Sequence, residues 1–346
     1  MLTGGKYGEE TKYGLSDAID RRNIWERSMS EKVRGLARLH VPGHGTRLGA
    51  VTDQDIHVDL STDCGGLSAL LSRNTAADDF EKAVLSLHDR AETVIRRSEL
   101  SPATEEAKPH LLSPADEQEC WGAGCTYHVD NLEKMRRARP LYAAAYEADR
   151  PLLFFKASAF RVAGPSDSIA CRRDSGQTIP EAELAVLLSP TGEAVAYAMG
   201  NDVTALDVER SNSLYQPQAK IFDGSAALGP WWTPASMAPE ALTTPFTCIV
   251  TRQGKTVLKQ EIDPGRMTRG VDELAQWLYR SASFPDGAVL MTGGGASVPE
   301  GFTLREGDAV KIDHPRLGEL RNVVLSSSSS SSSGNERKGR EYVAQA

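Results

Sequence analysis

The hydrophobic and polar positions along the chain change their period and so mark out its elements. Over residues 36–60, short runs alternate apolar with polar side chains between Gly- and Asp-rich turns. This pattern predicts a meander of short strands. Residues 78–98 repeat apolar side chains at helical spacing, which predicts a helix. Two further helical patterns cover 130–148, with a break at Pro140, and 271–279.

These elements group into four segments and predict an α+β protein that is mainly β. Residues 1–35 form a polar extension, and 36–110 form a small N-terminal α/β domain. The Pro-rich stretch 101–114 leads into a larger unit at 115–325, whose strands are short and often β-branched. Residues 326–346 open with eight consecutive serines, and such a tract buries too little apolar area to order itself. We therefore expect a disordered tail.

Composition excludes several classes of protein. The 39 basic and 47 acidic residues give a net charge of −8, which argues against a nucleic-acid partner. No apolar run approaches the length of a membrane span, and no secretory leader is visible. Five cysteines form no C-x-x-C pair, which predicts reduced thiols. We therefore expect a cytoplasmic globular protein with no nucleic-acid or membrane partner.

A β-hairpin is predicted in the middle of the larger unit. In residues 183–188, every side chain after Glu183 is apolar, so both faces of the segment are apolar. This pattern predicts a strand buried on both sides. A Pro-Gly turn follows, and 194–199 return as a second strand. Centring the hairpin near Thr191 places Glu183 roughly opposite Met199.

Three carboxylates gather at the open end of this hairpin. Glu181 and Glu183 are two residues apart, so both side chains point to the same side of the chain. The same register pairs Glu181 roughly with Asn201, which places Asp202 beside the two glutamates, about 5 Å across the ladder. Mutual repulsion and loss of hydration both oppose such an arrangement.

A hard divalent cation removes that conflict, and an all-oxygen ligand set favours Mg²⁺, Ca²⁺ or Mn²⁺ over zinc. Two other interpretations remain open from the residues alone. The glutamates could lie at an exposed strand end and face water. Two of the acids could instead form a general acid–base pair of the glycosidase kind, although three converging acids fit that chemistry less well.

The same segment resembles the fumarylacetoacetate hydrolase superfamily in the order and spacing of its motifs. The resemblance covers 115–325, with a weaker echo of that family's small N-terminal domain over 36–100. The motifs that carry it are Glu181-Ala182-Glu183-Leu184-Ala185, Gly200-Asn201-Asp202-Val203-Thr204-Ala205-Leu206-Asp207, Lys220, Leu228-Gly229-Pro230-Trp231, Thr292-Gly293 and the stretch 304–322.

Within the superfamily the chain is most similar to the 2-keto-3-deoxy sugar-acid dehydratases of the D-arabinonate type. The resemblance implies a fumarylacetoacetate-hydrolase-like β-roll as the catalytic domain, and a homodimer or homotetramer. It also implies that Glu181, Glu183 and Asp202 bind Mg²⁺ or Mn²⁺. The motifs are Trp121-Gly122-Ala123-Gly124-Cys125-Thr126-Tyr127, Arg150-Pro151-Leu152-Leu153-Phe154-Phe155-Lys156-Ala157, Ile179-Pro180-Glu181 and Asn212-Ser213-Leu214-Tyr215-Gln216-Pro217-Gln218-Ala219-Lys220.

The activity implied is a lyase that dehydrates a 2-keto-3-deoxy pentonate to 2-oxoglutarate semialdehyde through an enolate. Its partner would be a small 2-keto acid, which chelates the metal through carboxylate and keto oxygens. Lys220 is the catalytic candidate, either to stabilise the enolate or to move a proton. Tyr127, Lys156, Gln218 and Thr292 are the candidates for substrate binding. Lys156 could equally extend its ammonium group from the end of a buried strand.

Three departures from the family pattern qualify this interpretation. Many family members have arginine at the position of Leu206, and Gly294 replaces a threonine, so two polar donors are missing. The hydrolytic members usually carry a histidine paired with an acid. Here Asp130 lies close to where that histidine would fall, and the nearest histidine is His128, which disfavours hydrolysis of a C–C bond. Two alternatives therefore stay open: a hydrolase that cleaves an acylpyruvate or other diketo acid, and a metal-binding paralogue without catalysis.

Overall fold

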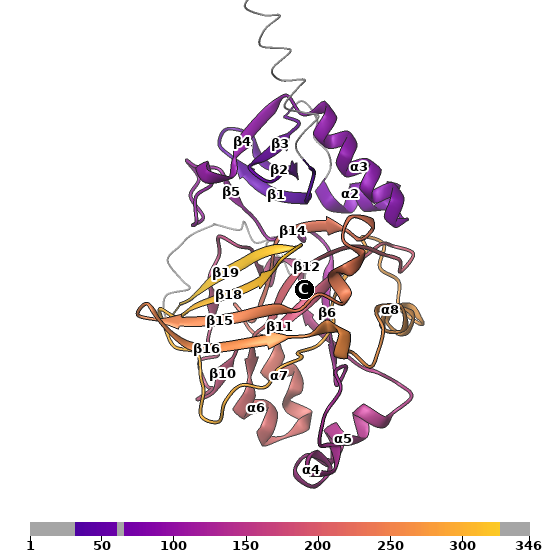
Figure 1. Ribbon diagram of the computed structural model, residues 1–346, viewed down its shortest axis with the longest axis vertical. Helices are drawn as coiled ribbons and strands as arrows, with labels where there is room; N and C mark the ends of the chain where they lie inside the picture. Colours follow the sequence, from indigo (N-terminus) through magenta and orange to yellow (C-terminus); the bar gives the residue numbers. More distant parts are fainter. Residues whose placement is uncertain (1–31, 61–65, 326–346) are drawn as a thin grey trace, which may run out of the picture.

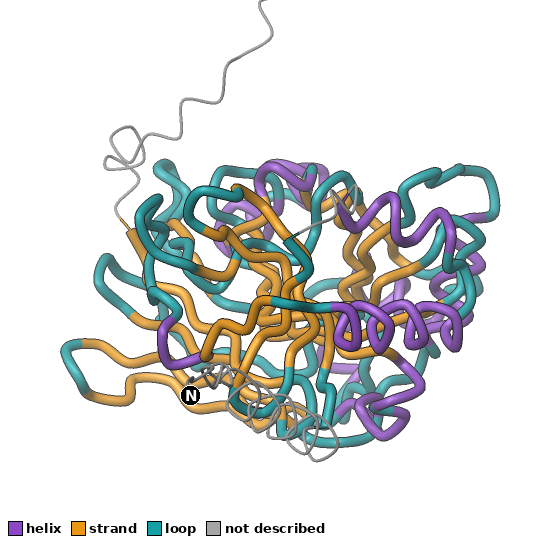
Figure 2. The backbone as a smooth tube through the Cα atoms, turned by 90° about the horizontal axis from the view of Figure 1, so that it is seen from above, coloured by secondary structure: helices purple, strands orange, loops and turns teal. Residues whose placement is uncertain are grey.

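The structure is a computed structural model that describes residues 32–60 and 66–325, and it is mainly β (Figure 1). Most of the predicted N-terminal extension and the whole predicted Ser-rich tail lie outside these residues. Seen from above, strands run through the middle of the molecule and most helices lie to the right of them (Figure 2). The predicted class, α+β and mainly β, is confirmed.

A large sheet of twelve strands forms the centre of the molecule. Its main path runs β4-β3-β2-β1-β14-β12-β11-β17-β6-β7, with β5 beside β1 and β8 beside β14. The strands are β1 (Gly35–Val41), β2 (Gly45–Val51), β3 (Asp55–Val58), β4 (Thr93–Arg96), β5 (His110–Leu111), β6 (Glu119–Gly124), β7 (Leu152–Ala157), β8 (Val162–Ala163), β11 (Ala182–Leu188), β12 (Ala194–Asp202), β14 (Ala226–Pro234) and β17 (Ala288–Met291).

A second sheet of five strands, in the order β16-β15-β18-β19-β9, packs against the first, and β10 pairs with β13 separately. Figure 1 shows β15, β16, β18 and β19 side by side in orange and yellow, in front of β11 and β12. The bounds are β9 (Ile169–Ala170), β10 (Thr178–Ile179), β13 (Thr204–Ala205), β15 (Phe246–Arg252), β16 (Lys255–Ile262), β18 (Ala309–His314) and β19 (Gly318–Leu325).

Helices are short and lie around the sheets. The α-helices are α2 (Gly66–Arg73), α3 (Ala77–Arg90), α4 (Leu132–Ala138), α5 (Pro140–Glu147), α6 (Leu206–Ser211), α7 (Gln216–Lys220) and α8 (Val271–Tyr279). The 3₁₀ turns are η1 (Arg97–Glu99), η2 (Ala159–Arg161), η3 (Ser213–Tyr215), η4 (Ala235–Met237), η5 (Pro239–Leu242) and η6 (Pro264–Arg266). Among the described residues, no helix is long and apolar enough to cross a membrane.

The predicted helices are present, but one of them, α3, ends earlier than predicted. The break at Pro140 separates α4 from α5, and α8 has the predicted bounds. The predicted helix over 78–98 was wrong in its last third, since α3 ends at Arg90 and the chain then becomes extended at Ala91. Val94 continued the helical spacing by coincidence, because it lies in β4 with 51% of its surface exposed.

The doubly apolar strand β11 is buried on both faces because it separates two cores. Leu184 and Val186 point into a cluster that includes the second sheet, while Ala185 and Leu187 point into a cluster that includes α2 and α3. All seven residues of β11 are therefore buried, as the run of apolar side chains predicted.

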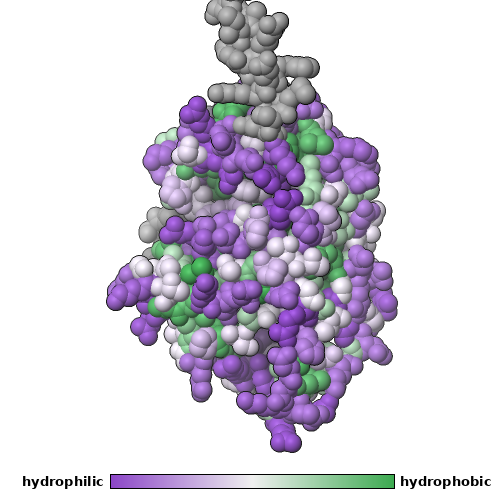
Figure 3. All heavy atoms as spheres, viewed as in Figure 1, coloured by the Kyte–Doolittle hydropathy of each residue, from purple (hydrophilic) through white to green (hydrophobic). Residues whose placement is uncertain are grey.

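The N-terminal segment shares both a sheet and a core with the rest of the chain. β1 pairs with β14 at Leu36 and Trp232, so the large sheet continues across the predicted boundary. Phe80 and Val84 of α3 belong to the same cluster as Leu187 of β11. The division at 36–110 and 115–325 stays a prediction. Figure 3 shows one face of the assembled molecule, largely hydrophilic, with hydrophobic side chains in small separate groups.

Replacing Phe80 with alanine should destabilise the whole chain, because its fully buried ring fills the shared core. Deleting such a ring typically costs about 3–5 kcal/mol. The exposed Leu85 on the same helix offers the control, and Leu85→Ala should change stability by less than about 1 kcal/mol. Calorimetry should show one transition that shifts as a whole. Two transitions, of which Phe80→Ala moves only one, would contradict a shared core.

Candidate metal centre

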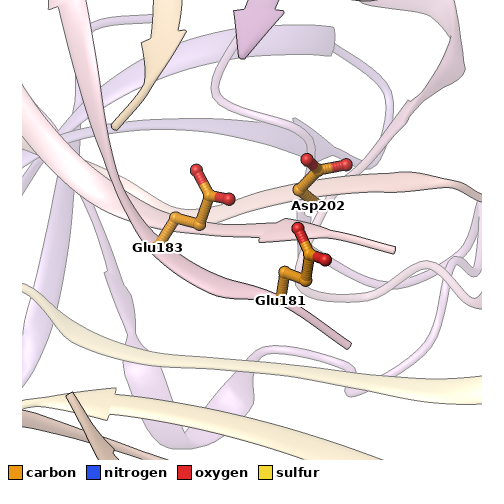
Figure 4. A group of neighbouring side chains, drawn as sticks. All are labelled: Glu181, Glu183 and Asp202. Atoms are coloured by element: carbon orange, nitrogen blue, oxygen red, sulfur yellow. The ribbon is translucent and has the colours of Figure 1, made fainter. Parts of the chain in front are cut away.

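Three carboxylates converge at one end of the β11–β12 hairpin (Figure 4). Glu181 directly precedes β11, Glu183 lies within it and Asp202 ends β12. An oxygen atom from each lies within 4.8 Å of the others, a grouping that could hold a metal ion. Glu183 and Asp202 are buried, whereas 23% of the Glu181 side chain is exposed. Solvent therefore reaches the group from the side of Glu181.

The pairing that produces this convergence differs by one residue from the predicted register. Glu183 lies opposite Gly200, rather than Met199, because the ladder is irregular between Leu187 and Leu188. A bulge of this kind adds one residue to one strand and shifts every pair beyond it. The shift leaves Asp202 beside the two glutamates.

Lys220 binds two of the three carboxylates, Glu181 and Asp202. Its Nζ donates to Glu181 Oε2 at 2.8 Å and to Asp202 Oδ2 at 2.7 Å. The third hydrogen bond goes to Thr204 Oγ1 at 2.8 Å. An ammonium group has three N–H donors, so all of them are used. The side chain is nearly fully buried, at the end of α7.

Lys156 pairs with the other carboxylate oxygen of Asp202. Its Nζ lies 2.5 Å from Asp202 Oδ1, and it donates to the carbonyls of Val203 and Lys220 at 3.0 and 2.6 Å. The residue is fully buried on β7. Its ammonium group thus faces protein oxygens on three sides and ties the carboxylate of Asp202 to the backbone of α7.

Glu183 lies on the least compensated side of the group. Within the described residues its carboxylate accepts one hydrogen bond, from the Gly293 N–H at 2.7 Å. Gly293 has φ +104°, a region that favours glycine, and a Cβ there would lie 2.1 Å from Thr126 Oγ1. Burial, with the charges of Asp202 and Glu181, raises the pKa of Glu183 well above its ordinary value.

The neighbouring groups shift in directions that follow from their partners. Burial raises the pKa of Glu181, although Lys220 opposes that rise. Burial also opposes ionisation of Asp202, but Lys156 and Lys220 outweigh it and hold the pKa of Asp202 below its ordinary value. Burial would lower the pKa of Lys220, but the carboxylates raise it well above the usual range. For Lys156, burial outweighs the attraction of Asp202 and lowers the pKa.

The residues present fit a divalent cation. With all three carboxylates ionised, the two ammonium groups offset two of the charges and leave one on Glu183, which no cationic side chain contacts among the described residues. A divalent cation would reverse that charge to +1, and a monoanionic 2-keto acid would then neutralise it. Carboxylate oxygens alone are ligands typical of Mg²⁺, Mn²⁺ or Ca²⁺.

The other predicted substrate contacts lie at different depths. The Tyr127 hydroxyl is buried and has no hydrogen-bond partner among the described residues, and burial, with the charge of Glu183, raises its pKa. Thr292 is fully buried and donates its hydroxyl to the Leu184 carbonyl at 3.1 Å. Gln218 is exposed on α7.

The structure also shows the surroundings of the residues that depart from the family pattern. Leu206 is buried at the start of α6, and a Cβ on Gly294 would contact the Glu181 side chain at 3.6 Å. The His128 side chain is 60% exposed and lies 3.7 Å from Asp130, whose carboxylate accepts from Arg266 at 2.6 Å.

Sequence reasoning missed a second polar group near the carboxylates. Glu209 is buried on α6, and the Arg139 guanidinium approaches it to 3.4 Å and stacks over the Tyr142 ring at 3.8 Å. Glu209 lies three residues after Leu206, so its place on the same helical face could have been noticed. No local pattern indicates that Arg139 reaches it.

Comparison with known proteins decides the family. The family model described as "Fumarylacetoacetate (FAA) hydrolase C-terminal" matches residues 119–325, more than half of the chain. The chain belongs to the fumarylacetoacetate hydrolase family. The resemblance stated from the motifs is thereby confirmed.

Two relatives within this family carry dehydratase names. The "Probable 2-keto-3-deoxyxylonate dehydratase" of Haloferax volcanii is 35% identical over 223 residues, 63% of this chain and 75% of that protein. The 2-dehydro-3-deoxy-D-arabinonate dehydratase of Saccharolobus solfataricus is 33% identical over 221 residues, 62% of this chain and 74% of that protein.

A solved structure of the same fold supports the fumarylacetoacetate-hydrolase-like architecture. It is a 2-keto-3-deoxy-D-arabinonate dehydratase complexed with magnesium and 2,5-dioxopentanoate, with a TM-score of 0.69 and 27% identity. It covers 84% of this chain and 98% of its own. The fumarylacetoacetate hydrolase of Exiguobacterium antarcticum shares the fold, with a TM-score of 0.60 at 21% identity over 84% of this chain and 99% of its own.

Glu183→Gln should stabilise the metal-free protein as pH rises. Because the pKa of Glu183 is raised in the folded state, wild type loses stability from the ordinary value of 4.5 upward through the raised value. Glutamine is neutral and still accepts from the Gly293 N–H. The Tm of the variant should therefore exceed that of wild type by an amount that grows with pH, and Mg²⁺ should abolish the advantage. The exposed Glu300→Gln is the control. A variant Tm that stays below wild type at all pH values would contradict this assignment.

Proposed function

We propose that the chain is a Mg²⁺-dependent lyase that dehydrates a 2-keto-3-deoxy pentonate to 2-oxoglutarate semialdehyde, which is 2,5-dioxopentanoate. The observation that carries this proposal is the group of Glu181, Glu183 and Asp202, two of which bind Lys220. It occurs in a chain that is 35% and 33% identical to two proteins named as dehydratases of such acids.

Glu181, Glu183 and Asp202 would hold the metal. When bound, Mg²⁺ supplies a Lewis acid that polarises the ketone of the substrate and offsets the negative charge that develops on it. Lys156 keeps Asp202 in place and ionised, since it binds the oxygen that Lys220 does not contact. Mn²⁺ or Ca²⁺ satisfies the same oxygen donors.

The dehydration has two steps, loss of a proton from C3 and loss of the hydroxyl from C4. A proton leaves C3 next to the ketone, and the hydroxyl on C4 then leaves by β-elimination. Lys220 is suited to the first of the two roles predicted for it, stabilising the enolate, because its nitrogen carries three donors and directs no lone pair at a substrate.

The predicted substrate contacts divide by their surroundings. We propose that Tyr127 donates its buried, unpartnered hydroxyl to a substrate oxygen. Gln218, exposed on α7 two residues before Lys220, would meet the hydroxyl end of the acid. Thr292 and Lys156 already bond to protein groups, so we propose that they position the loop at Gly293 and the carboxylate of Asp202.

Other predicted properties remain proposals. We propose a cytoplasmic homodimer or homotetramer that binds no nucleic acid. Free thiols at Cys120, Cys125, Cys171 and Cys248 support a reducing compartment, and the net charge of −8 argues against nucleic acid. The exposed His128, whose neighbour Asp130 binds Arg266, supports a lyase over a hydrolase that activates water.

Proton NMR of the products tests this function. Purified protein with 2-keto-3-deoxy-pentonate should form 2,5-dioxopentanoate in the presence of Mg²⁺, and chelator should stop the reaction. Glu183→Gln should lower kcat/KM by at least about 100-fold, the upper range for loss of a group that merely supports a ligand, while Glu300→Gln leaves it unchanged. Turnover that persists in chelator, or cleavage of an acylpyruvate in its place, would overturn the proposal.

A further inference from the structure

The proposed reaction needs a proton acceptor that the metal centre does not provide. Lys220 donates all three of its N–H groups, and the three carboxylates beside it are the proposed metal ligands. A base at C3 must therefore come from another side chain. Because this requirement arises from the dehydration, the inference rests on the proposed function.

Glu209 is the buried carboxylate best placed for this task. Of the buried carboxylates in the described ranges outside the triad, Asp308 pairs with Arg252 at 2.7 Å and Asp59 follows β3 in the N-terminal segment. Glu209 is 7% exposed and lies on α6. Figure 1 shows α6 beside α7, which ends at Lys220, and the two helices are in contact.

Glu209 also lies close enough to act on the centre electrostatically. Its charge contributes to raising the pKa of both Glu181 and Lys220, after the stronger influences already described. α6 begins at Leu206, two residues after Thr204, whose hydroxyl accepts a hydrogen bond from Lys220. The helix that carries Glu209 therefore starts beside the carboxylate group, and it contacts α7, which carries Lys220.

We propose that Glu209 is the proton carrier of the dehydration. Its carboxylate takes the C3 proton, so that the C3–H bond breaks and the electron pair moves into the enolate. The enolate then forms the C3–C4 double bond and expels the C4 hydroxyl, which takes that same proton from Glu209 and leaves as water. Glu209 returns to the carboxylate form, and the product at this stage is a 2-keto-3-ene acid that still carries the C5 hydroxyl.

The same carboxylate completes the conversion to the aldehyde. It takes a proton from C5 and returns it to C3, which moves the double bond to C4–C5 and leaves an enol at C5. The enol gains a proton at C4 from water and loses its hydroxyl proton to water, giving the aldehyde. The sum of these steps is loss of one water, with no oxidant or reductant.

Arg139 positions Glu209 in this proposal. Its guanidinium lies 3.4 Å from the Glu209 carboxylate and stacks over Tyr142 at 3.8 Å, at the junction of α4 and α5. Leu206, one helical turn before Glu209, is apolar and buried, so the guanidinium beside this carboxylate comes from another element.

Deuterium exchange separates proton transfer from binding. In D₂O with Mg²⁺, Glu209→Gln should lose both C3 exchange into unreacted 2-keto-3-deoxy-pentonate and dehydration, each by about 100-fold or more, as expected for a general base. Mg²⁺ binding, measured calorimetrically, should stay within about 2-fold of wild type. Glu209→Asp should recover part of the exchange. Glu147→Gln, which removes a half-exposed carboxylate of α5, should behave as wild type.

Three results in the Glu209→Gln variant would overturn the inference while the proposed function stands. Exchange and dehydration near wild-type rates in Glu209→Gln would exclude the residue as proton carrier. Retained C3 exchange with lost dehydration would assign the C3 proton to another base. Equal losses of exchange and of Mg²⁺ binding would make Glu209 a structural residue. If wild type itself dehydrates no 2-keto-3-deoxy acid with either Mg²⁺ or Mn²⁺, the proposed function fails, and this inference fails with it.

Discussion

An excess of negative charge buried at one end of a β-hairpin is the constraint on which the rest of the site depends. Glu181, Glu183 and Asp202 lie within 4.8 Å of one another, yet two lysines compensate only two of the three charges. Water cannot screen the third, because Glu183 is buried. The arrangement is consistent with a site built to accept a divalent cation and then an anionic substrate.

The architecture holds the carboxylates at that separation by burying their strand on both faces. β11 separates two hydrophobic cores, so a change in its register would move apolar side chains of both out of place. β7 brings Lys156 and α7 brings Lys220 to the same carboxylate, Asp202. Three segments distant in sequence, β7, β12 and α7, thus meet at the carboxylate of Asp202. This convergence explains how a mainly β framework produces a compact polar site.

Much of this was predictable where the information is local. Period-two alternation placed Glu181 and Glu183 on one side, and the turn placed Asp202 near them. The one-residue error in register arose because a bulge depends on how the strands pack, which the spacing of apolar residues does not reveal. Val94 was assigned to a helix because its spacing fits a helix, although tertiary pairing of β4 with β3 places it in a strand.

Long-range contacts set the limit of sequence reasoning in the site. Lys156 follows two phenylalanines on a predicted strand, and nothing local shows that its ammonium would meet Asp202 and two carbonyls. Arg139 reaches Glu209 only because the α4–α5 pair folds toward α6. The hairpin register and the resemblance to a family gave the same ligand set, but neither gave the contacts of Lys156 or Arg139.

Calorimetric titration of Mg²⁺ into metal-free protein, with and without a simple 2-keto acid such as 2-oxobutanoate, tests whether the three carboxylates form a metal site. We expect one ion per chain and loss of that binding in Glu183→Gln. Binding should be tighter in the presence of the keto acid, because the acid neutralises the remaining positive charge. Absence of saturable binding, or binding that Glu183→Gln leaves unchanged, would contradict a metal site at these carboxylates.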